Sequence, residues 1–227
     1  MVVGGPARQP SFEDGFRQIG LEAEWVRTAV GEGNRERIRV LGSENAMSAE
    51  GFYAWNGILA SLTLAVQGCG WERRDPLCLP VLIERNKKNV LFVSSGDPYT
   101  GVTGPGRLPR SRNPKGAIVA ALARQNKKLL PEDVLFPVET TNTDEHDFMS
   151  ELLGCTSYVL LVHFSQRDLQ ARYEVSRLGD VNTQGYLSVR HPRWVAPPYP
   201  LTAQDFGRND PNEGFDGPGD YPVPPKS

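Results

Sequence analysis

The chain has 227 residues, of which 39% are hydrophobic, and this is enough for one sizeable core with length left over at the ends. Its 25 Lys and Arg residues nearly balance its 27 Asp and Glu residues. The resulting net charge of -2 excludes a whole-protein field that would draw the chain to nucleic acid or to an anionic membrane. Any site for an anion must therefore be local.

The three cysteines, Cys69, Cys78 and Cys155, form no C-x-x-C pair and leave one thiol over in any disulfide scheme. We expect reduced thiols in or near the core of an intracellular protein. Residues 1–10 lack the apolar segment of a secretory signal, and no run approaches the ~20 apolar residues of a membrane span. The sequence predicts a soluble, cytoplasmic protein without a membrane partner.

Residues 11–30 carry apolar side chains at irregular helical spacing and predict one or two short helices. Residues 35–41 alternate charged and apolar side chains, which is typical of a short edge strand. We expect residues 1–46 to form an N-terminal helical cap with this edge strand.

The clearest predicted element is a helix from Met47 to Gln67, with Ser48 as its cap and Gly68 at its end. An apolar stripe recurs along it at steps of three or four residues and is expected to lie in the core. The stripe consists of Phe52, Trp55, Leu59, Leu62 and Val66.

Two apolar strands follow, from Leu77 to Glu84 and from Asn89 to Ser94, joined by a polar turn of hairpin length. Pro80 has no amide hydrogen, so we expect the first strand at a sheet edge or at a bulge. The Gly- and Pro-rich stretch from Ser94 to Lys115 is a long loop, and such loops are usually functional or disordered. A helix rich in small residues is predicted from Gly116 to Lys128.

The C-terminal half alternates predicted strands and helices, which favours an α/β sheet with parallel pairing toward this half. The predicted elements are a strand from Val134 to Val138, a short helix from Asp144 to Leu153, a buried strand from Tyr158 to Phe164, a helix at 166–175 and a strand from Tyr186 to Val189. Residues 47–191 would form the core domain. Residues 192–227 are rich in proline and predict an irregular arm, from Trp194 onward, that could dock on a protein partner.

The order of elements from Met47 to Phe164 resembles that of the cytidine-deaminase-like fold, and the resemblance implies a three-layer α/β/α sandwich. Zinc deaminases of this kind need H-x-E or C-x-E and T-x-E-P-C motifs, because three N or S ligands hold zinc while a glutamate moves the proton. This chain has NPKGAI at 113–118 and VETTNTDEHD at 138–147, without the ligand set. The sequence therefore predicts a zinc-free scaffold with no cofactor, in which Glu139 falls where the family has its strand-end glutamate.

The loop from Ser94 to Lys115 contains four cations and no acid after Asp97. In the deaminase-like arrangement it lies over the carboxyl ends of the strands, where open α/β sheets bind ligands. We expect it to bind an anionic, nucleotide-like ligand or a nucleic-acid segment, together with the segment from Glu139 to Asp147. The alternative is a basic loop that is merely solvated. The candidate ligand-binding residues are Ser95, Asp97, Arg107, Arg110, Arg112 and Lys115.

A second hypothesis is a metal-independent enzyme that acts on a small polar substrate. Its candidate acid/base residues are Glu139, Asp144 and His146. Capping of a helix explains the same acidic cluster, because acidic residues in a first turn complement the helix dipole. A third hypothesis is a non-catalytic subunit that docks on a partner through the C-terminal arm.

Overall fold

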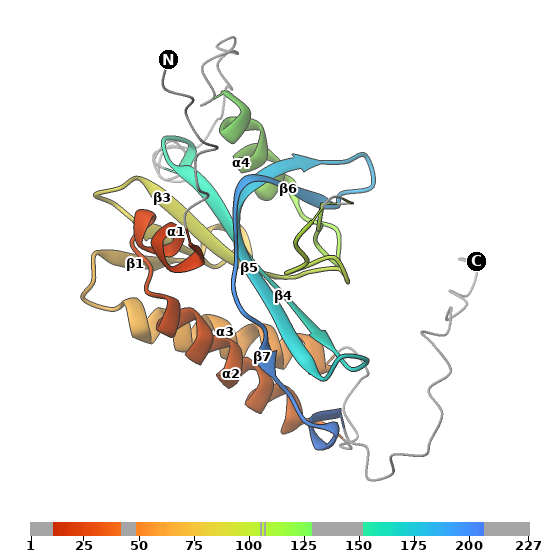
Figure 1. Cartoon of the computed structure of the whole chain (residues 1–227). Helices are drawn as coiled ribbons and strands as arrows, with labels where there is room; N and C mark the ends of the chain where they lie inside the picture. Colours follow the sequence, from red (N-terminus) through yellow and green to blue (C-terminus); the bar gives the residue numbers. More distant parts are fainter. Residues whose placement is uncertain (1–10, 42–48, 105, 107, 129–151, 207–227) are drawn as a thin grey trace, which may run out of the picture.

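The computed structural model describes residues 11–41, 49–104, 106, 108–128 and 152–206. In this part of the chain, helices lie against both faces of a mixed β-sheet (Figure 1). The α/β class predicted from the sequence is confirmed. None of the described helices is long and apolar enough to cross a lipid bilayer.

Three helices come first: α1 (Phe12–Gln18), α2 (Ala23–Ile38) and α3 (Ala49–Val66). Ser11 caps α1, because its hydroxyl accepts a hydrogen bond from the Asp14 amide at 3.2 Å. α3 confirms the helix predicted between Met47 and Gln67. The edge strand predicted at residues 35–41 is wrong, because these residues form the last turn of α2 and the turn that follows.

Glycines allow α2 and α3 to approach each other closely. A Cβ atom on Gly33 would lie 2.3 Å from Cγ1 of Ile58 and 2.7 Å from the carbonyl oxygen of Ala54. One on Gly57 would lie 2.9 Å from Cγ of Glu36. Glycine costs a helix about 1 kcal/mol relative to alanine, so this contact compensates for the poor helix propensity of α2.

Within the described residues, the sheet has seven strands. They are β1 (Trp71–Arg74), β2 (Val81–Glu84), β3 (Asn89–Ser95), β4 (Thr156–Ser165), β5 (Gln170–Val181), β6 (Leu187–Val195) and β7 (Tyr199–Pro200). β1 to β6 neighbour one another in chain order, and β7 pairs with β5. The pairing of β3 with β4 is parallel and that of the other named strands is antiparallel. The helix α4 (Ala117–Lys128) lies in the connection between β3 and β4, where the sequence predicted a helix.

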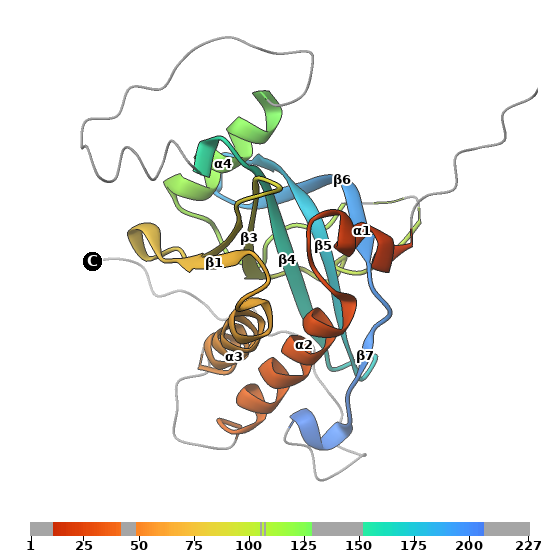
Figure 2. The same ribbon diagram turned by 90° about the vertical axis from the view of Figure 1, so that its left-hand side faces the viewer.

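Alternate residues of the central strands point to opposite faces of the sheet, as strand geometry requires. The face covered by α1, α2 and α3 carries Leu91, Val93, Tyr158, Leu160 and Val162. The face covered by α4 carries Val90, Phe92, Val159 and Leu161. Figure 2 shows α2 and α3 on one side of the sheet and α4 on the other.

The predicted core stripe of α3 is confirmed for Leu59, Leu62 and Val66, which are buried. It is wrong for Phe52, whose exposed fraction is 59%. The buried face of α3 is centred on Ala54, Gly57 and Ile58, because α2 packs there, and this turns Phe52 outward.

The hairpin of β2 and β3 confirms the two predicted apolar strands and their polar turn. β2 begins only after Pro80, however, and among the described strands the edge of the sheet is β1, which the sequence did not predict. Cys155 is buried as expected, whereas Cys69 and Cys78 are exposed free thiols, so the prediction of core thiols is wrong for these two.

The helix predicted at residues 166–175 is wrong, because this stretch forms a turn and the first half of β5. Ala171, Tyr173 and Val175 are buried at a period of two residues, which fits a strand. The irregular arm predicted from Trp194 onward is wrong for residues 194–195 and 199–200, which belong to β6 and β7, and residues 196–198 are irregular. Trp194 is 4% exposed and stacks on Tyr158.

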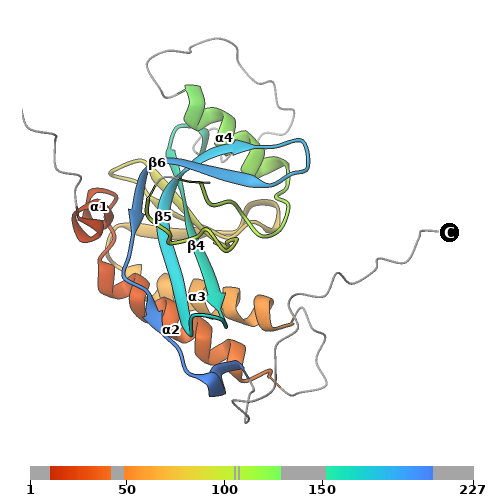
Figure 3. The same ribbon diagram turned by 45° about the vertical axis from the view of Figure 1, so that its right-hand side comes forward.

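After β6, the chain forms β7 beside α2 and a short 3-10 helix, Ala203–Phe206 (Figure 3). The predicted strand from Val134 to Val138 and the segment 144–151 lie outside the described residues, as do residues 207–227.

Candidate functional site

A cleft of about 660 Å³ lies at the carboxyl ends of the parallel strands β3 and β4. Ser95, at the end of β3, pairs with Val162 of β4, and both residues line the cleft. Open α/β sheets bind ligands outside the carboxyl ends of parallel strands. The cleft therefore lies at the end of the sheet that the loop after β3 was expected to cover.

The loop between β3 and α4 is fixed by backbone hydrogen bonds at both ends. The Arg112 amide donates to the Ser95 carbonyl at 2.8 Å, and the Lys115 amide donates to the Gly185 carbonyl at 2.8 Å. Directly before Arg112, the Ser111 amide donates to the Leu187 carbonyl at 2.8 Å. The end of the loop is thus held against β3 and β6 before any ligand arrives.

Arg112 and Lys115 bring positive charge to one wall of the cleft, next to Asn113. Neither side chain forms an ion pair with a carboxylate of the described residues. Burial lowers the pKa of Lys115 from its ordinary value, because the ammonium group loses hydration without gaining an acidic neighbour. An anion bound here would supply the missing counter-charge.

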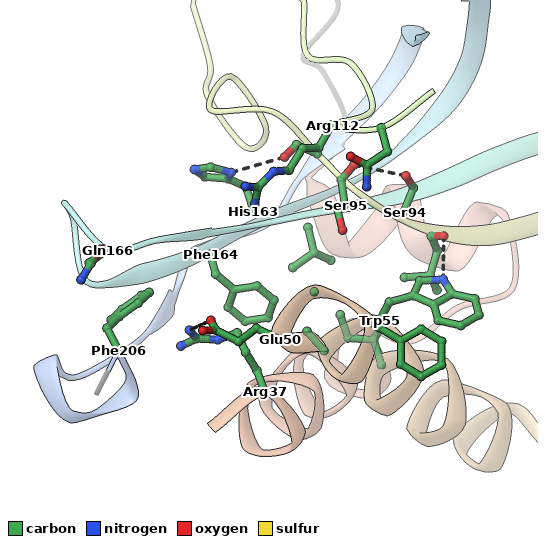
Figure 4. A pocket seen from close by; sticks show the side chains of 18 of the residues that line it. Arg37, Glu50, Trp55, Ser94, Ser95, Arg112, His163, Phe164, Gln166 and Phe206 are labelled. Atoms are coloured by element: carbon green, nitrogen blue, oxygen red, sulfur yellow. Dashed lines mark hydrogen bonds and ion pairs between the residues drawn. The ribbon is translucent and has the colours of Figure 1, made fainter. Parts of the chain in front are cut away.

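The opposite wall contains a buried arginine whose partners hold it in place. Arg37 is 4% exposed and donates to the Asn34 side-chain oxygen at 3.0 Å and to the Asp205 carbonyl. Its guanidinium lies 5.1 Å from the ring centre of Phe164 and 4.4 Å from that of Phe206. Glu50 is its ion-pair partner, at 3.6 Å. Figure 4 shows Arg37 and Glu50 across the cleft from Arg112.

Aromatic side chains complete the lining. Trp55 donates its indole N–H to the Val93 carbonyl at 3.2 Å, which fixes the orientation of its ring. Phe52 lies 5.8 Å from Trp55 between ring centres. Together with Phe164 and Phe206, these residues give the cleft flat apolar surfaces beside its charged groups. Such surfaces suit the face of a planar ring.

His163 also lines the cleft, half-buried in the last part of β4. Its Nδ1 is 3.3 Å from the Gly96 carbonyl oxygen. Burial, and then the nearby charges of Arg172 and Arg112, lower the pKa of His163, and the hydrogen bond to Gly96 opposes this only in part. His163 was not among the site residues that the sequence predicted.

Three of the predicted ligand-binding residues, Ser95, Arg112 and Lys115, come together in the cleft. The structure uses Asp97 and Arg110 differently: they lie 3.7 Å apart as an ion pair, and the Arg110 guanidinium stacks over Tyr186 at 4.9 Å. Neither is among the cleft residues. Arg107 lies outside the described residues, as do the acid/base candidates Glu139, Asp144 and His146. Within the described residues, no group of three His, Cys, Asp or Glu side chains could hold a metal ion.

Sequence reasoning missed Arg37, Glu50, Phe164 and Phe206 as cleft residues. Arg37 was hidden in a segment misread as a strand, and Glu50 in the first turn of α3 has the ordinary signature of a dipole-complementing residue. No pattern in the sequence links these positions, because they come together only when α2, α3 and the end of the described chain meet.

The comparisons with known proteins assign the chain to no family. No protein-family model matches the chain, and neither a curated protein nor a solved structure matches it. The resemblance to the cytidine-deaminase-like fold stays a prediction, and the geometry of the cleft carries the functional argument.

Proposed function

We propose that this cleft binds an anionic, nucleotide-like ligand. The observation that carries the proposal is the pair Arg112 and Lys115, which lacks carboxylate partners among the described residues and shares the cleft with aromatic rings, among them Trp55, whose orientation a hydrogen bond fixes. Cations bind phosphate through charge-assisted hydrogen bonds, and rings such as Trp55 accept the face of a base.

The number of cations favours a small ligand over a long nucleic-acid segment. Proteins that depend on phosphate contacts along a duplex neutralise about six to ten phosphates. The cleft offers Arg112 and Lys115 at one wall, while the charge of Arg37 is offset by Glu50. Two cations suit one phosphate or pyrophosphate group.

The scaffold forms part of the same proposal. We infer a three-layer α/β/α sandwich of the cytidine-deaminase-like kind that works without zinc. Helices on both faces of the sheet and the crossover from β3 through α4 to β4 support it. An experimental structure that covers residues 129–151 would test it, because the second motif position lies there.

The function is tested by calorimetric titration with mononucleotides and inorganic phosphate at low and high salt. Replacing Arg112 and Lys115 with alanine should weaken binding roughly tenfold or more for each lost contact to a charged group. Both replacements leave the backbone hydrogen bonds of the loop intact, so circular dichroism should show an unchanged fold. The matched control is Arg124→Ala, an exposed cation of α4 outside the cleft.

If the wild-type protein binds neither mononucleotide nor phosphate at low salt, the proposal is wrong and the loop is merely solvated. Equal binding by the double variant and the wild type would also contradict it. A single-stranded oligonucleotide serves as a further ligand: binding much tighter than that of a mononucleotide would point to a nucleic-acid segment instead.

A further inference from the structure

One wall of the cleft carries a cation, and the other carries an ion pair whose carboxylate is its exposed member. Arg112 lies on one wall, and the carboxylate of Glu50 lies across from it (Figure 4). Lys115 also lines the cleft. The Glu50 side chain is 43% exposed, and its Oε2 is 3.6 Å from Nη1 of Arg37. A ligand that spans the cleft would therefore meet cations at one end and a hydrogen-bond acceptor at the other.

Arg37 holds this acceptor in place. Its guanidinium is fixed by Asn34, by the Asp205 carbonyl and by the rings of Phe164 and Phe206. In the described part of the chain, Arg37 is the ion-pair partner of Glu50. An ionised carboxylate has about four acceptor positions on its two oxygens, so Glu50 retains positions for donors on a ligand.

We propose that Glu50 is a specificity-determining residue, which selects ligands that present two adjacent hydrogen-bond donors at the end opposite their anionic group. This inference rests on the proposed function. A carboxylate binds such a pair of donors with both oxygens, as it binds a guanidinium. It disfavours an edge that places an acceptor lone pair beside a donor, because the lone pair repels the carboxylate.

Two parts of a nucleotide have this chemistry. The edge of guanine presents its ring N–H next to its exocyclic amine, and an unmodified ribose presents two neighbouring hydroxyls. The edge of adenine presents a donor beside an acceptor and does not fit. The guanine edge and the ribose diol share a pair of adjacent donors. A ligand without the exocyclic amine and a ligand without the diol distinguish which of the two binds Glu50.

The test compares Kd values for four ligands that all contain phosphate: GMP, IMP without the exocyclic amine, 2′,3′-dideoxyguanosine monophosphate without the diol, and inorganic phosphate. The wild type should prefer GMP over IMP if the guanine edge binds Glu50, or over the dideoxy compound if the diol does. Glu50→Gln should raise the Kd of GMP roughly tenfold, as expected for one lost hydrogen bond to a charged group. The Kd of inorganic phosphate should not change.

The matched control is Glu32→Gln, because Glu32 also pairs with a neighbouring arginine of α2 but does not line the cleft. Glu50→Asp is the second variant. It keeps the charge but shortens the side chain, so it should lose the preference for GMP over IMP or over the dideoxy compound. The inference is overturned if the wild type binds all three nucleotides equally well, or if Glu50→Gln leaves the Kd of GMP unchanged. In both cases phosphate binding can persist, whereas failure of every ligand to bind would overturn the proposed function itself.

Discussion

Glu174 is bound to Arg193 through both of its carboxylate oxygens. Nε of Arg193 donates to Oε1 at 3.0 Å, and Nη2 donates to Oε2 at 2.6 Å. Glu174 is fully buried, and its Oε2 also accepts the Gly101 amide at 2.9 Å. The pair joins β5 and β6 to the start of the loop that covers the cleft.

Removal of one member of this pair should destabilise the protein strongly. Arg193→Met leaves a buried carboxylate without its counter-charge, and such a loss costs about 3–5 kcal/mol. The control is Arg73→Met, whose exposed ion pair with Asp75 should contribute no more than about 1 kcal/mol. Urea unfolding of both variants measures the difference, and equal losses would contradict this role of the pair.

The contact between α2 and α3 gives a prediction against helix propensity. Gly33→Ala should gain about 1 kcal/mol from propensity but lose more from overpacking, since the Ala54 carbonyl, at 2.7 Å from the added atom, belongs to the backbone and cannot rotate away. We expect a net loss in the free energy of unfolding. Gly51→Ala is the control, because its added Cβ meets nothing within 4 Å, and it should be neutral or stabilising. A stabilised Gly33→Ala variant would mean that the helices are farther apart.

Leu59, which is 1% exposed, tests the burial of α3. Leu59→Ala should lower the free energy of unfolding by about 2–5 kcal/mol, because it leaves a cavity under the helix. Leu64→Ala, at a residue 71% exposed on the same helix, should stay within about 0.5 kcal/mol of the wild type. Denaturant titration measures the free energy of unfolding of both variants. A small effect of Leu59→Ala would mean that this face of α3 does not pack in the core.

The lowered pKa of Lys115 gives the proposed binding a pH dependence. The ammonium group attracts an anion only below its pKa, so affinity for phosphate should fall as pH rises toward that lowered pKa, earlier than for a lysine with the ordinary value of 10.5. Lys115→Arg should keep its affinity over the same range, because arginine remains protonated. Kd values between pH 7 and 9.5 measure this, and parallel curves for the two proteins would contradict it.

His163 predicts a loss of stability in mild acid. Its pKa in the folded protein is lowered from the ordinary 6.5, chiefly by burial. Below pH 6.5 the unfolded chain takes up a proton at this residue more readily than the folded chain, so the free energy of unfolding falls as pH falls toward the lowered pKa. His163→Asn should lose less stability between pH 7.5 and pH 5.5 than the wild type. If the wild type and His163→Asn lose the same free energy of unfolding between these pH values, His163 is excluded as the cause.

The sequence predicted those elements whose signal is local. The stripe of α3, the apolar runs of β3 and β4 and the small-residue helix α4 all follow from spacing along the chain. The end of α2 and the start of β5 were misread because tertiary partners decide them: Gly33 suits α2 only when Ile58 faces it, and residues 170–175 form a strand because β4 pairs with them.

The residues of the candidate site also fall into those that the sequence could predict and those that it could not. Arg112 and Lys115 could be predicted because the loop precedes a helix and follows a strand, and open α/β sheets bind ligands at the carboxyl ends of their strands. Glu50 and Arg37 could not, because their meeting depends on how α2 crosses α3. Arg110 does not line the cleft, because Asp97 and Tyr186 together hold its side chain elsewhere.

The agreement between strand order and chain order has a kinetic consequence. Four of the pairings among β1 to β6 join neighbouring strands by short connections, which close quickly. The pairing of Asn89 with Thr156 in β3 and β4 must instead close the whole segment that contains α4, so we expect it to be the slow step of assembly. The cleft lies at this junction, so the proposed ligand would bind only after both groups of strands have joined, and its presence would retard their separation.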